Sequence, residues 1–175
     1  MSIVYYWTGW KRPSIYYSSK GSWALSTMNQ THKHHWFCFY LPETSCEFVL
    51  TDGNGCWDNP QNSEQNYFIP KEGRYAVYKG KLLEVHDNPK SVLLITDIDG
   101  TLLENNRWGR EALKRFTNYW ITTHLFNGSK LVYNTGRSLE EFLSLFSGGY
   151  EVLDPDLIVT SVGSDVYSID TVRYM

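Results

Sequence analysis

The stretch VLLITDIDGTLL, residues 92–103, decides how the rest of the sequence is interpreted. It opens with a continuous apolar run, which predicts a strand buried on both faces of a parallel sheet. Asp97 and Asp99 follow at spacing i, i+2, and Gly100 then permits a tight backbone path. Ligands of open α/β sheets bind at the carboxyl ends of the strands. Because two acids at such an end repel each other, this stretch predicts a site where a cation or a shared proton compensates their charge.

Downstream of this stretch, strands and helices alternate. Apolar residues recur at helical spacing in one segment, and Ser138 with Glu141 forms a capping box that opens a second helix. The expected elements are a helix over 108–124, a strand over 130–134, a helix from 138, and strands over 157–161 and 165–169. Such alternation predicts parallel pairing and right-handed crossovers, and therefore a partial α/β, Rossmann-like unit over residues 91–175.

Upstream, residues 1–86 follow a different pattern, with short runs rich in aromatic and β-branched residues between turn signals. The expected strands are Ser2–Trp7, Ser14–Tyr17, Trp36–Leu41, Glu47–Thr51, Asn66–Ile69 and Tyr75–Tyr78. Several short strands at this spacing predict an all-β sandwich or barrel. The polar, proline-containing segment 85–91 is the expected linker between two domains.

Composition narrows the classes of partner. Aromatic residues make up 16 % of the chain, with 7 tryptophans, which is more than a small core needs, so we expect some rings to face a ligand. The net charge of −3 provides no basic field for nucleic acid, and no run of about 18 apolar residues predicts a membrane span. Three cysteines without a secretion signal favour a reducing, cytoplasmic compartment; a plastid stays open, although no transit peptide is visible.

The Asp97-Ile98-Asp99-Gly100-Thr101 motif resembles the first motif of the haloacid-dehalogenase-like (HAD) phosphatases. The resemblance implies that Asp97 is the nucleophile and Asp99 the general acid and base. It also implies a Mg²⁺ cofactor held at Asp97 and Asp99, by the carboxylate of the first and the backbone carbonyl of the second. Thr135 and Gly136, at the end of the second strand, match the family's phosphate-binding position.

Within that family, residues 91–175 resemble the sucrose-phosphate phosphatases, on three segments: 94–102, 133–138 and 155–167. The resemblance implies a sugar-phosphate substrate. It also requires a lysine and a downstream acidic pair, which Lys130, Asp154, Asp156 and Asp170 do not match. We therefore expect roughly the first half of a catalytic domain, either truncated or a natural half-enzyme, with an exposed edge or an unfinished sheet.

Residues 3–80 resemble starch-binding carbohydrate modules of families 25 and 53, on pieces such as Gly21-Ser22-Trp23 and Trp57-Asp58-Asn59. The implied partner is starch or a related α-glucan, because flat aromatic rings bind the C–H face of a pyranose and amides bind its hydroxyl rim. The implied glucan-binding residues are Tyr16, Trp23, Trp57, Asn59 and Tyr67. By contrast, we expect Trp36, flanked by phenylalanines in a strand, to lie in the core.

Three functions follow for testing. The first is a glucan-anchored, Mg²⁺-dependent sugar-phosphate phosphatase that acts through an aspartyl-phosphate. The second is a starch- or glycogen-binding protein that carries a non-catalytic remnant of a phosphatase. The third, with the least support, is a β domain that docks another protein. Because fold alone does not fix function, the choice depends on the sites themselves.

Overall fold

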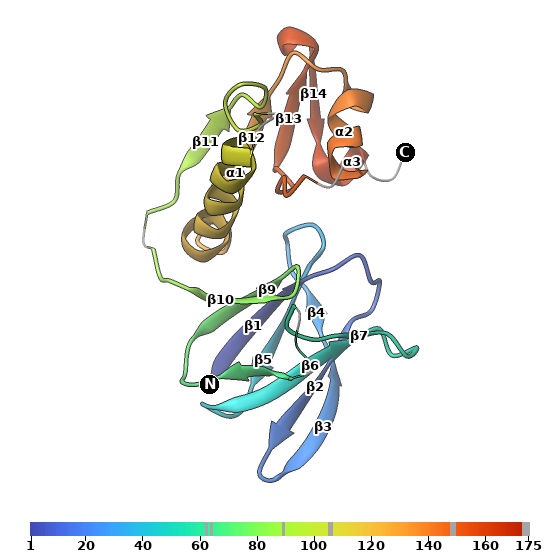
Figure 1. Ribbon diagram of the computed structural model, residues 1–175, viewed down its shortest axis with the longest axis vertical. Helices are drawn as coiled ribbons and strands as arrows, with labels where there is room; N and C mark the ends of the chain where they lie inside the picture. Colours follow the sequence, from blue (N-terminus) through green and yellow to red (C-terminus); the bar gives the residue numbers. More distant parts are fainter. Residues whose placement is uncertain (62, 64, 89, 105–106, 148–149, 173–175) are drawn as a thin grey trace. The chain divides into compact units, whose positions relative to one another are not determined.

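The computed structural model describes residues 1–175 except 62, 64, 89, 105–106, 148–149 and 173–175. The chain divides into two compact units, Met1–His86 (unit 1) and Asp87–Met175 (unit 2). Figure 1 shows strands in unit 1, and helices beside a sheet in unit 2. The expected change from an all-β pattern to an α/β pattern is therefore present.

The described part of unit 1 contains ten strands in two sheets. The strands are β1 Ser2–Trp7, β2 Ser14–Ser19, β3 Ser22–Thr27, β4 Asn29–Gln30, β5 Trp36–Leu41, β6 Cys46–Thr51, β7 Trp57–Asp58, β8 Tyr67–Ile69, β9 Arg74–Tyr78 and β10 Lys81–Val85. One sheet has the order β10-β9-β1-β5-β4, and the other has the order β3-β2-β6-β7 with β8 also paired to β6. Pairing is antiparallel except between β1 and β9.

The core of unit 1 draws side chains from both sheets. Val4 and Tyr6 of β1 join Ile15 of β2 and Phe48 of β6 in one buried cluster. Successive side chains of a strand point to opposite faces, so each of these strands also places side chains on the outer surface. Trp36 is 2 % exposed, which confirms the expected core tryptophan.

Four strands, β3, β4, β7 and β10, were not expected from the sequence, and β4 and β7 are only two residues long. β3 and β10 are each the second strand of a hairpin whose two-residue turn is Lys-Gly, at Lys20-Gly21 and Lys79-Gly80. All four residues have positive φ, between 47° and 80°, as a type I′ hairpin turn requires. β3 also consists mainly of small and polar residues and lies at a sheet edge, so no apolar alternation revealed it.

Unit 2 follows the expected order of elements. They are β11 Leu93–Thr96, α1 Arg107–Trp120, a π-helical turn Ile121–Leu125, β12 Lys130–Asn134, α2 Leu139–Ser147, β13 Leu157–Thr160, a 3₁₀ turn Ser161–Gly163, β14 Asp165–Ser168 and α3 Ile169–Val172. The sheet order is β11-β12-β13-β14. β11, β12 and β13 are parallel, whereas β14 returns antiparallel to β13 through the turn at Ser161–Gly163.

The sheet of unit 2 has a covered face and an open face. Tyr133 packs against Phe142 of α2 and pairs with Ile158, and all three are fully buried on the covered face. The opposite face carries a set of apolar side chains that are 40–64 % exposed. These residues, the open face, are Leu93, Ile95, Leu157 and Val166.

The geometry of the crossovers explains the open face. Both helical crossovers of the parallel strands step in one direction across the sheet, so right-handed connections place α1 and α2 on the same side. The expectation that the strand over 92–96 is buried on both faces is therefore wrong for the described elements. The expected exposed edge is observed among the described elements, because β11 is an edge strand.

Candidate functional site

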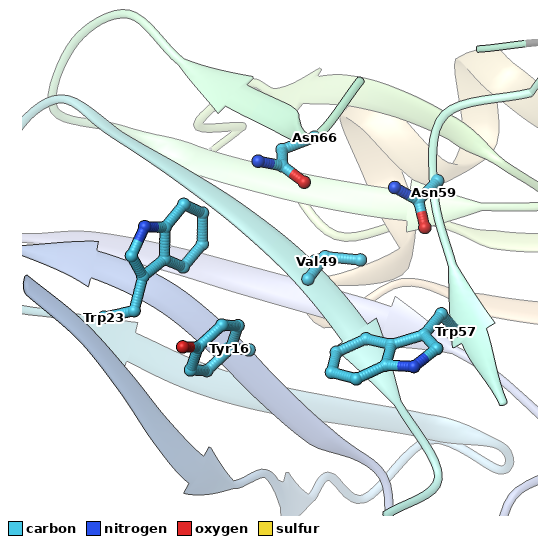
Figure 2. Close-up of a pocket in the computed structure, with 6 residues that line it drawn as sticks. All are labelled: Tyr16, Trp23, Val49, Trp57, Asn59 and Asn66. Atoms are coloured by element: carbon cyan, nitrogen blue, oxygen red, sulfur yellow. The ribbon is translucent and has the colours of Figure 1, made fainter. Parts of the chain in front are cut away.

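An aromatic groove lies on the outer surface of unit 1, on the β3-β2-β6-β7 sheet (Figure 2). Because Ile15 and Tyr17 of β2 point into the core, Tyr16 between them faces outward. The groove has a volume of about 290 Å³ and is lined by Tyr16, Trp23, Val49, Trp57, Asn59 and Asn66. Four of the five residues expected to contact a glucan are thus brought together.

The three rings of the groove form an angled platform. The Tyr16 and Trp23 rings are stacked, with centroids 5.0 Å apart and planes at 26°. Trp57 lies 6.3 Å from Tyr16 at 64°. The indoles remain accessible, at 39 % exposed for Trp23 and 55 % for Trp57, and both belong to strands, β3 and β7. Such a surface offers flat apolar area to the C–H faces of sugar rings.

Two asparagines supply polar groups on the other side of the groove (Figure 2). The Asn59 Nδ2 donates to the Gln65 carbonyl at 3.1 Å, and the Asn66 Nδ2 donates to Glu47 Oε2 at 3.2 Å. Each amide thus uses one of its two N–H groups within the protein, and its oxygen is available to accept a ligand hydroxyl. Sequence reasoning missed Asn66, although it immediately precedes a core tyrosine and so falls on the outward side of the alternation.

Tyr67 does not line the groove, so its assignment as a glucan contact is wrong. Its ring is 1 % exposed and stacks on Phe48 in the core. Its hydroxyl donates to Asp58 Oδ1 at 2.6 Å, and the Tyr6 hydroxyl donates to Asp58 Oδ2 at 2.9 Å. Burial, together with the Asp58 carboxylate, raises the pKa of both tyrosines, so both stay protonated as donors. The pair anchors Asp58, which directly follows Trp57 in β7.

A second candidate site lies where β11 ends. Asp97 follows the strand directly and is exposed, with Thr101 Oγ1 3.5 Å from its Oδ2. The Ile98 carbonyl then accepts the backbone N–H groups of Leu102 and Leu103, which closes a tight turn. Gly100 adopts φ +76° within this turn, as the sequence indicated.

Arg137 connects this turn to the end of β12. Its Nε donates to Asp99 Oδ2 at 2.8 Å, and a terminal nitrogen donates to Oδ1 at 2.6 Å, a bidentate ion pair. The hydrogen bonds from Arg137 lower the pKa of Asp99. The pairing shows that the two neighbouring strand ends meet, as expected for one site. The sequence analysis gave Arg137 no role, although it directly follows the Thr135-Gly136 pair.

The expected phosphate cradle at Thr135 and Gly136 is partly occupied by the protein itself. Thr135 is 2 % exposed, and its Oγ1 accepts the Arg137 backbone N–H at 3.2 Å. The predicted capping box is confirmed, because Ser138 N donates to Glu141 Oε2 at 2.8 Å and Glu141 N donates to Ser138 Oγ at 3.3 Å. The Glu141 carboxylate therefore lies at the N-terminus of α2, where an anion would otherwise be stabilised.

The donor type at the β11 end suits Mg²⁺. Mg²⁺ takes hard oxygen ligands, commonly one or two carboxylates with waters. The exposed Asp97 carboxylate meets this requirement, whereas the Asp99 carboxylate is engaged by Arg137. Among the residues that the structure describes, no group of three or more His, Cys, Asp or Glu side chains is arranged to hold a metal ion.

The strand end and turn of unit 2 resemble those of HAD-like phosphatases, and the comparison with known proteins finds a likeness for the same residues. Residues 90–174 match the family model of sucrose-6F-phosphate phosphohydrolase. A probable sucrose-phosphatase 3a of Arabidopsis thaliana is 38 % identical over 80 residues, which cover 46 % of this chain. The chain spans 18 % of that relative's length. The resemblance of residues 91–175 to sucrose-phosphate phosphatases is thus confirmed.

The other half of the chain is similar to solved carbohydrate-binding modules. One is the iodinated family 25 module of a Bacillus halodurans amylase, at 24 % identity and a TM-score of 0.42, covering 49 % of this chain and 95 % of that one. The same module in complex with maltotetraose gives 23 % identity and a TM-score of 0.42, covering 50 % and 98 %. Within the described residues, no helix is both long and apolar enough to cross a membrane.

Proposed function

We propose that residues 1–86 form a glucan-binding module and that its ligand is starch or a related α-glucan. The observation that supports this is the aromatic groove, in which exposed indoles lie opposite two amides. An α-glucan chain is curved, and rings set at an angle to each other on rigid strands can follow such a curve without a large ordering cost. The groove itself carries this proposal.

Residues 91–175 contribute the second part of the proposed function, phosphoryl transfer from a sugar phosphate. A carboxylate oxygen of Asp97 attacks phosphorus, and the bond to the sugar oxygen breaks. Asp99 donates a proton to that oxygen and then accepts one from the water that hydrolyses the aspartyl-phosphate. Asp97 and the Asp99 backbone carbonyl would hold Mg²⁺, which screens the negative charges that otherwise keep a carboxylate from a phosphate dianion.

The second candidate function is glucan binding without turnover. It is favoured by the state of the phosphoryl site, where Arg137 holds Asp99 and the Glu141 carboxylate caps α2. In this state Asp99 is ionised and cannot donate a proton. The two candidates share the groove and differ only in whether unit 2 reacts.

Two measurements on the whole chain separate these outcomes. Retention on amylose resin should be lost in a Trp23→Ala, Trp57→Ala double variant and kept in Trp108→Ala, an exposed tryptophan of unit 2. Unchanged retention of the double variant would reject the groove. Mg²⁺-dependent phosphate release from sucrose 6-phosphate that disappears in Asp97→Asn supports the phosphatase. No release, with retention intact, supports the binding-only function.

A further inference from the structure

Arg137 has a fixed backbone and an exchangeable side chain. Its N–H donates to Thr135 Oγ1, and its carbonyl accepts the Ser161 N–H at 2.9 Å, so the main chain is held from both sides. The Arg137 side chain is 31 % exposed and the Asp99 side chain 48 % exposed, so the ion pair between them is open to solvent. Exposed ion pairs contribute little stability, so this pair can exchange partners at small cost.

Two backbone donors next to the Arg137 side chain are already committed. The Arg137 N–H is bound by Thr135 and the Ser138 N–H by Glu141. An arriving phosphoryl group would therefore find the guanidinium as the accessible cationic donor of this turn. Its planar fork fits phosphate oxygens as well as it fits a carboxylate, and it remains charged at any working pH.

The same ion pair would weaken the binding of a divalent cation at Asp97. While Arg137 holds Asp99, its positive charge neutralises one of the two carboxylates that would attract a divalent cation, and it lies beside the place where that cation would bind. A phosphoryl group that draws the guanidinium away restores the second negative charge. Arg137 also interacts with Glu141, so that its release from Asp99 leaves it near another carboxylate.

Resting on the phosphoryl site proposed above, we infer that Arg137 couples phosphate binding to Mg²⁺ binding by exchanging Asp99 for phosphoryl oxygens. Arg137 is thus a positioning residue that controls when Asp99 is available. Binding linkage is reciprocal, so phosphate must tighten Mg²⁺ binding by the same factor by which Mg²⁺ tightens phosphate binding. Coupling of this kind between two ligands is typically about 5- to 150-fold.

The test is calorimetric titration of Mg²⁺ into the whole chain, with and without inorganic phosphate, and with blank titrations of Mg²⁺ into phosphate subtracted. For the unsubstituted chain we expect the Kd for Mg²⁺ to fall by about 5-fold or more when phosphate is present. In Arg137→Gln, Mg²⁺ alone should bind more tightly than to the unsubstituted chain, and phosphate should change the Kd less than about 2-fold. Arg110→Gln, at an exposed arginine of α1, should behave like the unsubstituted chain.

The outcomes separate this inference from the function on which it rests. Mg²⁺ binding that is lost in Asp97→Asn, but is equal in Arg137→Gln and insensitive to phosphate in both chains, overturns the coupling and leaves the metal site standing. No Mg²⁺ binding in any of the chains overturns both. Arg137→Lys keeps the charge without the planar fork, so an intermediate phosphate effect supports bidentate exchange rather than a general effect of charge. Circular dichroism of each variant verifies that it is folded.

Discussion

Removal of Trp57 should weaken glucan binding more than removal of Trp23, and the exposed areas give the size of each effect. If a whole tryptophan presents about 250 Å², the 55 % exposure of Trp57 leaves about 140 Å² in solvent. A sugar ring on one face of the indole covers roughly half of this, about 70 Å², worth ~1.7 kcal/mol at about 25 cal/mol per Å². Trp57→Ala should therefore raise the Kd about 20-fold.

The same reasoning gives a smaller effect for Trp23, which is 39 % exposed. About 50 Å² would be covered, worth ~1.2 kcal/mol or about 8-fold in Kd. Tyr16 stacks on Trp23, so Trp23→Ala exposes the tyrosine ring as a partial replacement, and about 8-fold is an upper bound.

The assay is calorimetric titration of the whole chain with a soluble malto-oligosaccharide, and the control is Trp108→Ala, which is 79 % exposed in unit 2. The reasoning is refuted if Trp57→Ala changes the Kd by less than about 2-fold, an energy below ~0.5 kcal/mol. It is also refuted if the control matches Trp57→Ala, because the effect would then not depend on the groove.

Four further predictions concern stability and surface. Asp58→Asn should destabilise unit 1 by about 1–3 kcal/mol in urea unfolding, because two buried tyrosine hydroxyls lose a charged acceptor; no change would remove the anchoring role of Asp58. Gly100→Ala should lower the thermal midpoint of unit 2, because an alanine at φ +76° costs about 1–2 kcal/mol. Gly136→Ala should be nearly neutral, because φ is not positive there and an added Cβ meets no atom within 4 Å. Equal effects of the two substitutions would contradict the turn geometry. The backbone hydrogen bond from Ser138 lowers the pKa of Glu141 below its ordinary 4.5. The stabilisation that Glu141 provides as a cap is therefore present above that pH and is lost as the pH falls through the pKa of the folded state. The difference in thermal midpoint between the unsubstituted chain and Glu141→Ala should vanish in acid, and a difference that stays constant with pH would count against the cap. Ile95→Ser should reduce the fluorescence of a hydrophobic dye bound to the chain, whereas Leu25→Ser, at a 60 % exposed leucine of unit 1, should not; an unchanged signal in Ile95→Ser would mean that the open face is not accessible in solution.

Strand positions could be predicted where a short run was rich in apolar residues, and predictions failed where turn chemistry was needed. Trp36–Leu41 and Lys130–Asn134 have the predicted bounds because each run supplies several buried apolar side chains. β3 and β10 form because Lys-Gly turns with positive φ fold each strand onto a neighbour. Lysine in the left-handed region is unusual, so these dipeptides did not indicate hairpins.

The groove shows which parts of a binding site a sequence can reveal. Trp23 and Trp57, which the family resemblance implied as glucan contacts, are exposed and line the groove. Tyr67 was assigned from the same resemblance, whereas Tyr67 and Ile69 share the buried parity of β8 and leave Asn66 on the outer side. Successive side chains of a strand point to opposite faces, so only one of two neighbouring residues can contact a ligand on the outer face. Applied to this strand, the rule would have predicted Asn66 in place of Tyr67.

The two carboxylates of the proposed phosphoryl site, Asp97 and Asp99, could be predicted from the sequence, whereas the arginine that pairs with Asp99 could not. Asp97 and Asp99 are fixed by their place after an apolar run, because the end of a parallel strand is where such groups gather. The pairing of Arg137 with Asp99 depends on the register of β12 against β11 and on the turn before α2, neither of which a local motif encodes. Arg137 was therefore not predicted, because its pairing with Asp99 exists only once the two strand ends lie side by side.

β11 brings the sequence pattern and the structure into apparent conflict, and crossover geometry resolves it. Its run of Leu, Leu and Ile is typical of a strand covered on both faces, yet the described helices cover only one. Helices reach the second face of a parallel sheet only when the strand order reverses direction, and β11-β12-β13 never reverses. Leu93 and Ile95 are therefore suited to burial that the described elements of unit 2 do not provide. The Asp97–Asp99 turn follows this same edge strand, so any group that covers the open face or pairs with β11 would also border the proposed phosphoryl site.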